Sequence, residues 1–167
     1  MRIVIHDLPA RELEALGLQT DADTQIISDN GTIKPCVGCF GCWIKTPGQC
    51  VIKDGYYTLG EWISRCKDLI IVSECAYGGF SPFVKNVLDR SISYISPHFI
   101  IRKKEMHHRR RYDNVINISA YFYGVDITEK EKSTAISLVN ANAVNYDANV
   151  SGVYFYNSAD EAKGVLV

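Results

Sequence analysis

The chain has 167 residues and a mass of 18.7 kDa, which suits one domain with a complete hydrophobic core and is too short for two independent cores. We therefore expect one domain over residues 1–167. Hydrophobic residues make up 47% and charged residues 22% of the chain, a composition that excludes an intrinsically disordered protein. The net charge of -1 excludes a general electrostatic attraction to nucleic acid or to an acidic membrane.

The N-terminal sequence MRIVIHDLPA does not have the pattern of a signal peptide, because its short apolar run is broken by His6, Asp7 and Pro9. No apolar run approaches the roughly 20 residues that a membrane-spanning helix needs. We expect a cytoplasmic protein with neither a membrane nor nucleic acid as its partner. In a reducing compartment its six cysteines would be thiols or metal ligands rather than disulfides.

Five short runs are apolar and rich in β-branched residues without strict alternation, which predicts strands buried on both faces. They are RIVIH from Arg2, TQIIS from Thr24, LIIVS from Leu69, VINISAYF from Val115 and GVYFY from Gly152. Strands of this kind are typical of a parallel sheet.

The first and last predicted helices are short. ARELEALGL follows the first strand and reaches Gly17 within about two and a half turns. The C-terminal segment SADEAKGVLV leaves little room for a helix after the fifth strand.

Three further helices are predicted between the strands. Residues 59–66 repeat apolar side chains at helical spacing. Ser81 is a good N-cap before an apolar stripe over residues 84–95. Thr128 and Glu131 have the spacing of a capping box at the start of the next helix.

Strands and helices therefore alternate along the chain. Alternation with crossover helices predicts an α/β fold with a doubly wound parallel sheet and right-handed connections. In such a sheet the ligand crevice lies beyond the carboxyl ends of the strands, at the point where the strand order reverses.

The stretch PCVGCFGCWIKTPGQC contains four cysteines, Cys36, Cys39, Cys42 and Cys50. Three cysteines at C-x2-C-x2-C can face one corner of a 4Fe-4S cluster, and a fourth after a turn closes the cage. The alternatives are a redox dithiol between Cys39 and Cys42, a zinc site, or small buried side chains in a compact turn. Because the stretch follows the second strand, we expect it near the ligand crevice.

Two motifs carry a resemblance to a known family. One is the C-x2-C-x2-C-x7-C spacing, and the other is ECAYGGFSPFVKNVLDRS, in which an aromatic-Gly-Gly loop leads into a helix. From Arg2 to about Tyr156 the chain resembles the flavodoxin-like NAD(P)H-dependent FMN reductases and their iron-sulfur flavoprotein branch. The resemblance implies a five-stranded sheet in the order 2-1-3-4-5. It also implies that FMN takes hydride from NAD(P)H and passes electrons to a second acceptor, which the sequence does not identify.

The resemblance implies that two segments border the flavin ring, namely the loop after the third strand and the tip of the fourth. Their residues are Ala76, Tyr77, Gly78, Gly79, Phe80, Ser81, Tyr123 and Gly124. The glycines allow close approach of the backbone, and Tyr77 and Phe80 can stack on a flat ring. The loop is equally compatible with a glycine turn capped by Ser81, with its aromatic rings packed on the core. Because the flavin would do the chemistry, no side chain is predicted as a catalytic acid or base.

The loop HDLPARE departs from the phosphate-binding loop of that family. Asp7 lies where the FMN phosphate would approach, Pro9 lacks an N-H donor and Glu12 adds negative charge. A carboxylate about 4 Å from a phosphate costs on the order of 1 kcal/mol per charge pair in water, and more in a protein cleft. The alternative hypothesis is therefore a flavodoxin-fold protein that has lost the usual FMN binding and acts as an oligomeric binding or regulatory protein. A third hypothesis, an iron-sulfur flavoprotein electron carrier, depends on the four cysteines.

Two features bear on assembly. The first and last helices would cover the same face of the sheet, so that short helices would leave an apolar face exposed, and we expect a homo-oligomer, in particular a dimer. The stretch RKKEMHHRRR begins at Arg102 and carries six Lys or Arg residues. The topology places it at the amino edge of the sheet, opposite the crevice, where we expect a solvated connection.

Overall fold

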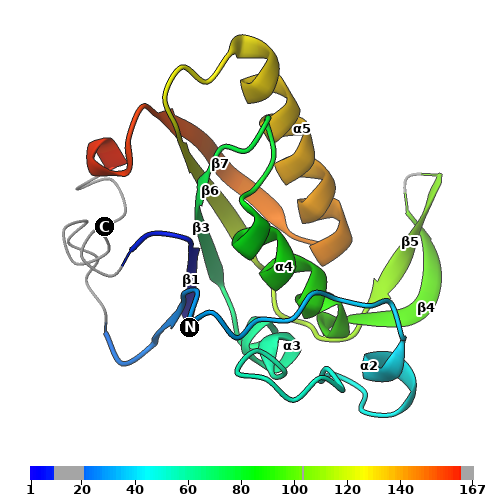
Figure 1. The fold of residues 1–167 in the computed structure, drawn as a ribbon. Helices are drawn as coiled ribbons and strands as arrows, with labels where there is room; N and C mark the ends of the chain where they lie inside the picture. Colours follow the sequence, from blue (N-terminus) through cyan, green and yellow to red (C-terminus); the bar gives the residue numbers. More distant parts are fainter. Residues whose placement is uncertain (10–20, 103, 163–167) are drawn as a thin grey trace.

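The computed structural model describes residues 1–9, 21–102 and 104–162 (Figure 1). The predicted first helix and the end of the predicted last helix lie outside these residues. In chain order the elements are β1 (Arg2–His6), β2 (Thr24–Ile27), α2 (Gly41–Ile44), α3 (Leu59–Ser64), β3 (Asp68–Glu74), α4 (Pro82–Arg90), the 3-10 helix η1 (Ser91–Tyr94), β4 (Ile95–Arg102), β5 (Glu105–Arg110), β6 (Asn117–Tyr123), α5 (Glu129–Tyr146), β7 (Asn149–Tyr156) and the 3-10 helix η2 (Ala159–Ala162). No helix among the described residues is both long enough and apolar enough to cross a bilayer.

The central sheet has five parallel strands in the order β2-β1-β3-β6-β7. Arg2 of β1 lies between Thr24 of β2 and Asp68 of β3, which sets the register at the centre of the sheet. Counted in chain order, the five strands of this sheet follow the order 2-1-3-4-5. The predicted doubly wound α/β sheet and its strand order are therefore confirmed, and the order reverses between β1 and β3.

One face of the sheet is covered by α3, α4 and α5 (Figure 1). Ile63, Val87 and Val139 point from the three helices into a core that includes Ile5 and Ile71 of the central strands. All five side chains are buried. Burial of one such side chain stabilises the fold by about 1.5–3 kcal/mol relative to its exposure.

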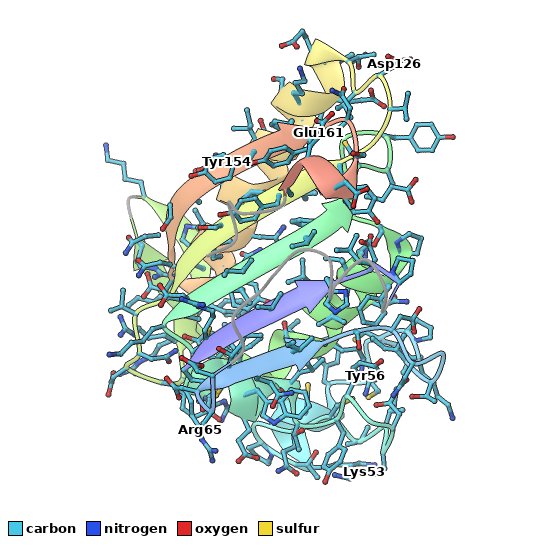
Figure 2. All side chains as sticks on the ribbon, turned by 90° about the vertical axis from the view of Figure 1, so that its left-hand side faces the viewer. Lys53, Tyr56, Arg65, Asp126, Tyr154 and Glu161 are labelled. Carbon is cyan, nitrogen blue, oxygen red and sulfur yellow. The ribbon has the colours of Figure 1, made fainter. Side chains whose placement is uncertain are left out.

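Figure 2 shows the opposite face of the sheet, where η2 packs. Val72 and Tyr121 contact Ala159 and Ala162 there. The ring of Tyr154 on β7 stacks on Tyr121, with 4.9 Å between the ring centroids. In the described residues the predicted last helix is thus a single turn of 3-10 helix.

The helix after β3 ends earlier than the apolar stripe predicts. It stops at Arg90, and the chain turns through η1 into β4 at Ile95. The hydroxyl of Ser91 donates to the carbonyl of Leu88, which adds to the hydrogen bonds from the Ser91 amide that end the helix. Apolar residues beyond this point therefore belong to another element, although their spacing continues the helical pattern.

The basic segment forms one strand and part of another in a hairpin, so the prediction of a solvated connection is wrong. β4 and β5 pair antiparallel, and Lys104 at the turn has a positive φ of 69°. Figure 1 shows the hairpin projecting from the rest of the molecule. Its position at the amino edge is as predicted, because Arg102 and Arg110 form ion pairs with Asp147, the residue that ends α5. The connection between β4 and β5 contains no Asn-Gly dipeptide, the strongest short signal for a hairpin.

The capping box at the start of α5 gives a test of local stability. Thr128 Oγ1 accepts the amide N-H of Glu131 at 3.3 Å, and Glu131 Oε2 accepts the amide N-H of Thr128 at 2.9 Å. We expect Thr128→Ala to lower the free energy of unfolding by about 1 kcal/mol, because the amide N-H of Glu131 loses its acceptor at the helix end. Ser137→Ala, on an exposed turn of the same helix, should change it by less than about 0.5 kcal/mol. Urea denaturation measures both values, and equal effects would contradict the role of the cap.

Candidate functional site

Strands β1, β3 and β6 end at the same edge of the sheet. Glu74 at the tip of β3 pairs with Tyr123 at the tip of β6, and Asp7 directly follows β1. The loop over residues 76–81 continues from β3, and the amide of Gly124 donates to the carbonyl of Tyr156 at 3.1 Å. We call these residues at the strand tips the carboxyl-edge site. The structure therefore brings the predicted ring-contact segments to one place.

The loop after β3 begins with a tight turn. Ala76 and Gly79 exchange two backbone hydrogen bonds of 3.0 and 2.8 Å, and Tyr77 and Gly78 between them have φ values of 53° and 80°. Positive φ at both central residues is characteristic of a type I′ turn. A Cβ atom on Gly78 would lie 2.9 Å from the side chain of Thr134 on α5, so the turn packs closely on that helix. Tyr77 is 94% exposed, which leaves both faces of its ring open to a ligand.

Phe80 and Ser81 face inward, in contrast to Tyr77. Phe80 is only 8% exposed and stacks on Phe122 at 5.2 Å between ring centroids, so its ring is not available to stack on a ligand. Ser81 Oγ accepts the amide N-H of Val84 as the N-cap of α4. Its own amide donates to Ser73 Oγ at 2.8 Å. These two residues hold the loop in place, which corrects the expectation that Phe80 stacks on the flavin.

Asp7 joins the tips of three strands. Its Oδ2 atom accepts the amide N-H of Glu74 at 2.9 Å, and its Oδ1 atom accepts the hydroxyl of Tyr123 at 2.9 Å. The carboxylate thus occupies two donors that a bound anion would need.

Further carboxylates lie near this edge. Glu74 and Asp126 are exposed, and Glu131 lies in the first turn of the adjacent α5. Hydrogen bonds from the backbone and side chain of Thr128 lower the pKa of Glu131, so that it stays ionised near neutral pH. The described part of the site thus has a negative potential that disfavours a phosphate group.

His6, at the end of β1, is a buried polar residue that the sequence patterns did not single out. Neither of its ring nitrogens has a hydrogen-bond partner among the described residues. Burial lowers its pKa, although the charge of Asp7 acts in the opposite direction. The imidazole is therefore neutral near pH 7 and adds no positive charge to compensate the carboxylates.

The cysteine-rich stretch lies away from the carboxyl-edge site, so the expectation that it borders the crevice is wrong. Cys36 lies beside Asp89 and Ile92, at the carboxyl end of α4. The indole N-H of Trp43 donates to the carbonyl of Ile95 at 3.1 Å, where the hairpin begins. Because α4 runs antiparallel to the strands, its last turn lies at the amino edge of the sheet. The chain follows α4 along its length after leaving β2.

All four cysteines of the stretch line one small cavity of about 50 Å³ together with Arg90, and we call this cavity the thiol pocket. Cys36 and Cys39 are exposed, Cys42 is half-buried and Cys50 is buried. Within residues 1–9, 21–102 and 104–162, no group of three or more Cys, His, Asp or Glu side chains is arranged to hold a metal ion. The predicted 4Fe-4S cluster and the zinc alternative are therefore unsupported by the structure.

Arg90, which lines the thiol pocket, forms a buried ion pair with Asp54. Arg90 Nη1 and Nη2 donate to the two carboxylate oxygens of Asp54 at 2.7 and 2.9 Å. The side chains of Arg90 and Asp54 are 0% and 6% exposed. Burial is the largest influence on Asp54 and acts to raise its pKa. The hydrogen bonds from Arg90 and from the amides of Tyr56 and Lys34, with the charge of Arg90, together outweigh burial and lower the pKa to about 2. Sequence analysis missed this pair, although Arg90 follows Val87 by three residues and so falls on the buried stripe of α4.

A larger cavity of about 410 Å³ adjoins the same end of α4. Its lining includes Cys36, His108 of the hairpin, and Asn142, Asn145 and Tyr146 of α5. Cys36 lines both this cavity and the thiol pocket.

The buried ion pair predicts a pH-dependent stability. The pKa of Asp54 is lower in the folded state than the ordinary value near 3.8, so its stabilisation is present above about pH 4 and is lost as the pH falls towards 2. Asp54→Asn should lower the free energy of unfolding by about 3–5 kcal/mol at pH 7, because the guanidinium loses its buried counter-charge.

The difference in the free energy of unfolding between the native protein and Asp54→Asn should become smaller as the pH falls from 4 to 2, as measured by urea denaturation. Asp68→Asn is the matched control, because Asp68 is exposed and should contribute less than about 0.5 kcal/mol. A difference that stays constant between pH 4 and pH 2 would contradict the assignment.

Comparison with solved structures shows that the fold is flavodoxin-like. The Trp repressor binding protein from Bacillus subtilis has 16% sequence identity and a TM-score of 0.58, over 100% of this chain and 99% of that chain. The NAD(P)H:quinone oxidoreductase from Methanothermobacter marburgensis has 15% identity and a TM-score of 0.56, over 98% of this chain and 93% of that chain. General stress protein 14 from Treponema denticola, solved in complex with FMN, has 10% identity and a TM-score of 0.54, over 99% of this chain and 90% of that chain.

No protein-family model and no curated protein sequence matches the chain. At the identities found, the comparisons establish the shared fold. The resemblance seen in the sequence motifs is confirmed at that level.

Proposed function

We propose that this flavodoxin-like chain is a flavin-dependent oxidoreductase that takes hydride from NAD(P)H and passes electrons to a second acceptor. The observation that carries the proposal is the exposed type I′ turn at Tyr77 and Gly78, which lies beside the point where the strand order reverses. Ligands of doubly wound sheets bind at that point. The similar structures of an NAD(P)H:quinone oxidoreductase and of a protein in complex with FMN give the proposal further support.

The residues of the carboxyl-edge site fit the ring of FMN better than its phosphate. Tyr77 would stack on one side of the ring, while the backbone at Gly78 and Gly79 permits close approach. Tyr123 and Gly124 would border the other side. When bound, FMN would supply the hydride and electron chemistry. Asp7 holds the hydroxyl of Tyr123 in a fixed direction, so the tyrosine is positioned before any ligand arrives.

In the pose that the family resemblance implies, the phosphate of FMN would lie against the carboxylate of Asp7. The Glu74 amide and the Tyr123 hydroxyl already donate to Asp7, and therefore neither is free for a phosphate oxygen. We expect the ring to provide most of the binding free energy and the phosphate to oppose it. The consequence is a weak preference between FMN and riboflavin, which lacks the phosphate.

Asp7→Asn tests this balance of charges. The asparagine keeps one acceptor for Tyr123 or Glu74 but removes the negative charge. Each repulsive charge pair costs about 1 kcal/mol or more, and Asp7→Asn removes these pairs. FMN should therefore bind to Asp7→Asn at least about tenfold more tightly than to the native protein. Riboflavin affinity should change by less than about twofold, because riboflavin has no phosphate. Quenching of flavin fluorescence during titration gives both dissociation constants.

Asp126→Asn serves as the matched control, because it removes an equal charge from an exposed residue near the same edge. FMN affinity should change less in this variant than in Asp7→Asn. Equal tightening for FMN and riboflavin in Asp7→Asn would show that charge is not the cause. Reduction of the bound flavin by NADH or NADPH, followed as bleaching of its absorbance, completes the test of the enzyme.

The second candidate is a flavodoxin-fold protein that no longer binds flavin and acts as a binding or regulatory protein. The hydrogen bonds of Asp7 favour it, because the side chain fills the place of an external anion. If neither the native protein nor Asp7→Asn binds FMN or riboflavin at the highest soluble concentration, the enzyme proposal fails and this candidate stands.

We also propose that the chain forms a homo-oligomer through the hairpin of β4 and β5. Phe99, Ile101 and Met106 on the hairpin are 63%, 76% and 69% exposed. A two-stranded hairpin is marginally stable without packing, and exposed apolar clusters mark interfaces. The basic side chains of the hairpin complement the carboxylates near Asp7 and Glu74, which favours a second copy of this chain as the occupant. The sequence-based prediction of a homo-oligomer depended on short first and last helices, which lie largely outside the described residues.

Replacement of Phe99, Ile101 and Met106 together by serine should convert the oligomer to a monomer, because the interface loses its apolar contacts. Light scattering at micromolar concentration measures the mass. A control variant replaces Ile44 and Val125, which are 77% and 83% exposed and lie outside the hairpin, and it should remain oligomeric. A native protein that is already monomeric would contradict the proposal.

A further inference from the structure

The guanidinium of Arg90 holds two parts of the cysteine-rich stretch beside each other. Its Nη1 atom donates to the carbonyl of Lys34 at 2.6 Å, and its Nη2 atom donates to the carbonyl of Ile52 at 3.2 Å. Cys36 follows Lys34 by two residues, and Cys50 precedes Ile52 by two residues. Both cysteines line the thiol pocket, so one buried side chain brings these two thiols to a common cavity.

The third nitrogen of the Arg90 guanidinium, Nε, carries a hydrogen that makes no hydrogen bond among the described residues. Nε is buried and has no hydrogen-bond partner among the described residues, although the same side chain makes four other hydrogen bonds. An unsatisfied donor of a charged group is costly when buried. Cys50 lines the pocket with Arg90, and its interaction with the guanidinium is one of the causes that raise the pKa of Arg90. A thiolate at Cys50 would supply the missing acceptor.

Cys36 connects the thiol pocket with solvent. It is exposed, and it also lines the adjoining cavity of about 410 Å³. Asn142, Asn145 and His108 give that cavity polar groups. A small polar molecule in the larger cavity would therefore contact the thiol of Cys36, while Cys50 stays covered behind it.

We propose that the thiol pocket is a redox-active thiol centre for low-molecular-weight disulfides, in which Cys36 is the entry thiol and Cys50 is the resolving thiol. The thiolate of Cys36 attacks one sulfur of the substrate disulfide, the substrate S-S bond breaks, and one thiolate leaves. The thiolate of Cys50 then attacks the sulfur of Cys36 and expels the second thiolate. The protein loses two electrons to form a Cys36-Cys50 disulfide, and the substrate gains them as two thiols. A dithiol reductant reverses both steps.

Cys39 and Cys42 are bystanders in this scheme. Burial raises the pKa of Cys42, and the neighbouring thiols raise it further, so Cys42 stays protonated near neutral pH. The proposed redox pair, Cys36 and Cys50, therefore differs from the Cys39-Cys42 dithiol that the sequence spacing suggests. The inference does not depend on the flavin, because both reactants of the proposed step are sulfur compounds.

The test uses the full chain, reduced and then incubated with oxidised glutathione in the absence of flavin and NAD(P)H. We expect the loss of two free thiols per chain and one disulfide that links the peptides containing Cys36 and Cys50, as identified by mass spectrometry without reduction. Cys36→Ser should lose this reaction. Cys50→Ser should stop at a mixed disulfide between Cys36 and glutathione, and Cys39→Ser and Cys42→Ser should react within about twofold of the native rate.

Arg90→Lys tests the positioning role of the guanidinium. Lysine keeps the charge but cannot present the same fork of donors. The second step should slow by about tenfold or more, so that the mixed disulfide at Cys36 accumulates, while formation of that mixed disulfide is unchanged. If this variant does not fold, the four cysteine variants decide the proposal by themselves.

Two results would overturn the proposal. One is a Cys36→Ser variant that forms the same number of disulfides at the native rate. The other is stoichiometric iron and labile sulfide in anaerobically purified protein, which would make the thiols cluster ligands. Both results are independent of flavin binding, so failure here and failure of the proposed oxidoreductase are distinguishable.

Discussion

The irregular segment between β2 and β3 depends on the buried contact between Arg90 and Asp54. The segment between β2 and β3 contains only two short helices and therefore satisfies few of its own backbone groups. Arg90 compensates by binding the carbonyls of Lys34 and Ile52, while Asp54 accepts the amides of Lys34 and Tyr56. Removal of either partner would leave a buried charge and release both ends of the cysteine-rich stretch. The ion pair thus specifies a conformation that this stretch cannot maintain by itself.

The carboxyl edge follows a different principle, in which a short carboxylate replaces an external ligand. Asp7 fixes the relative positions of the β3 backbone and the Tyr123 side chain without a bound anion. These two hydrogen bonds preorganise the strand tips relative to one another. The same hydrogen bonds reduce what a phosphate would gain on binding. An occupied anion position and an exposed aromatic turn together favour a flat ligand with little negative charge.

The sequence predicts the sheet well because buried parallel strands need continuous apolar runs, and all five runs lie in the expected order. The capping box at Thr128 is equally local and was predicted correctly. The hairpin was missed because its register depends on contacts with Asp147, a residue far along the chain. The position of the cysteines was predicted wrongly because it follows from Arg90, whose partners lie 36 to 56 residues away. At the carboxyl-edge site, patterns predicted the glycine turn but could not show that Tyr77 turns outward and Phe80 inward.

Helix α4 begins at the carboxyl-edge site with its cap Ser81 and ends at the thiol pocket with Arg90. Its nine residues span about 14 Å, at 1.5 Å per residue. Groups that exchange a hydride or a sulfur bond must approach to about 3 Å, so one substrate cannot react at both ends of this helix. If both proposals hold, the length of one helix separates the two chemistries.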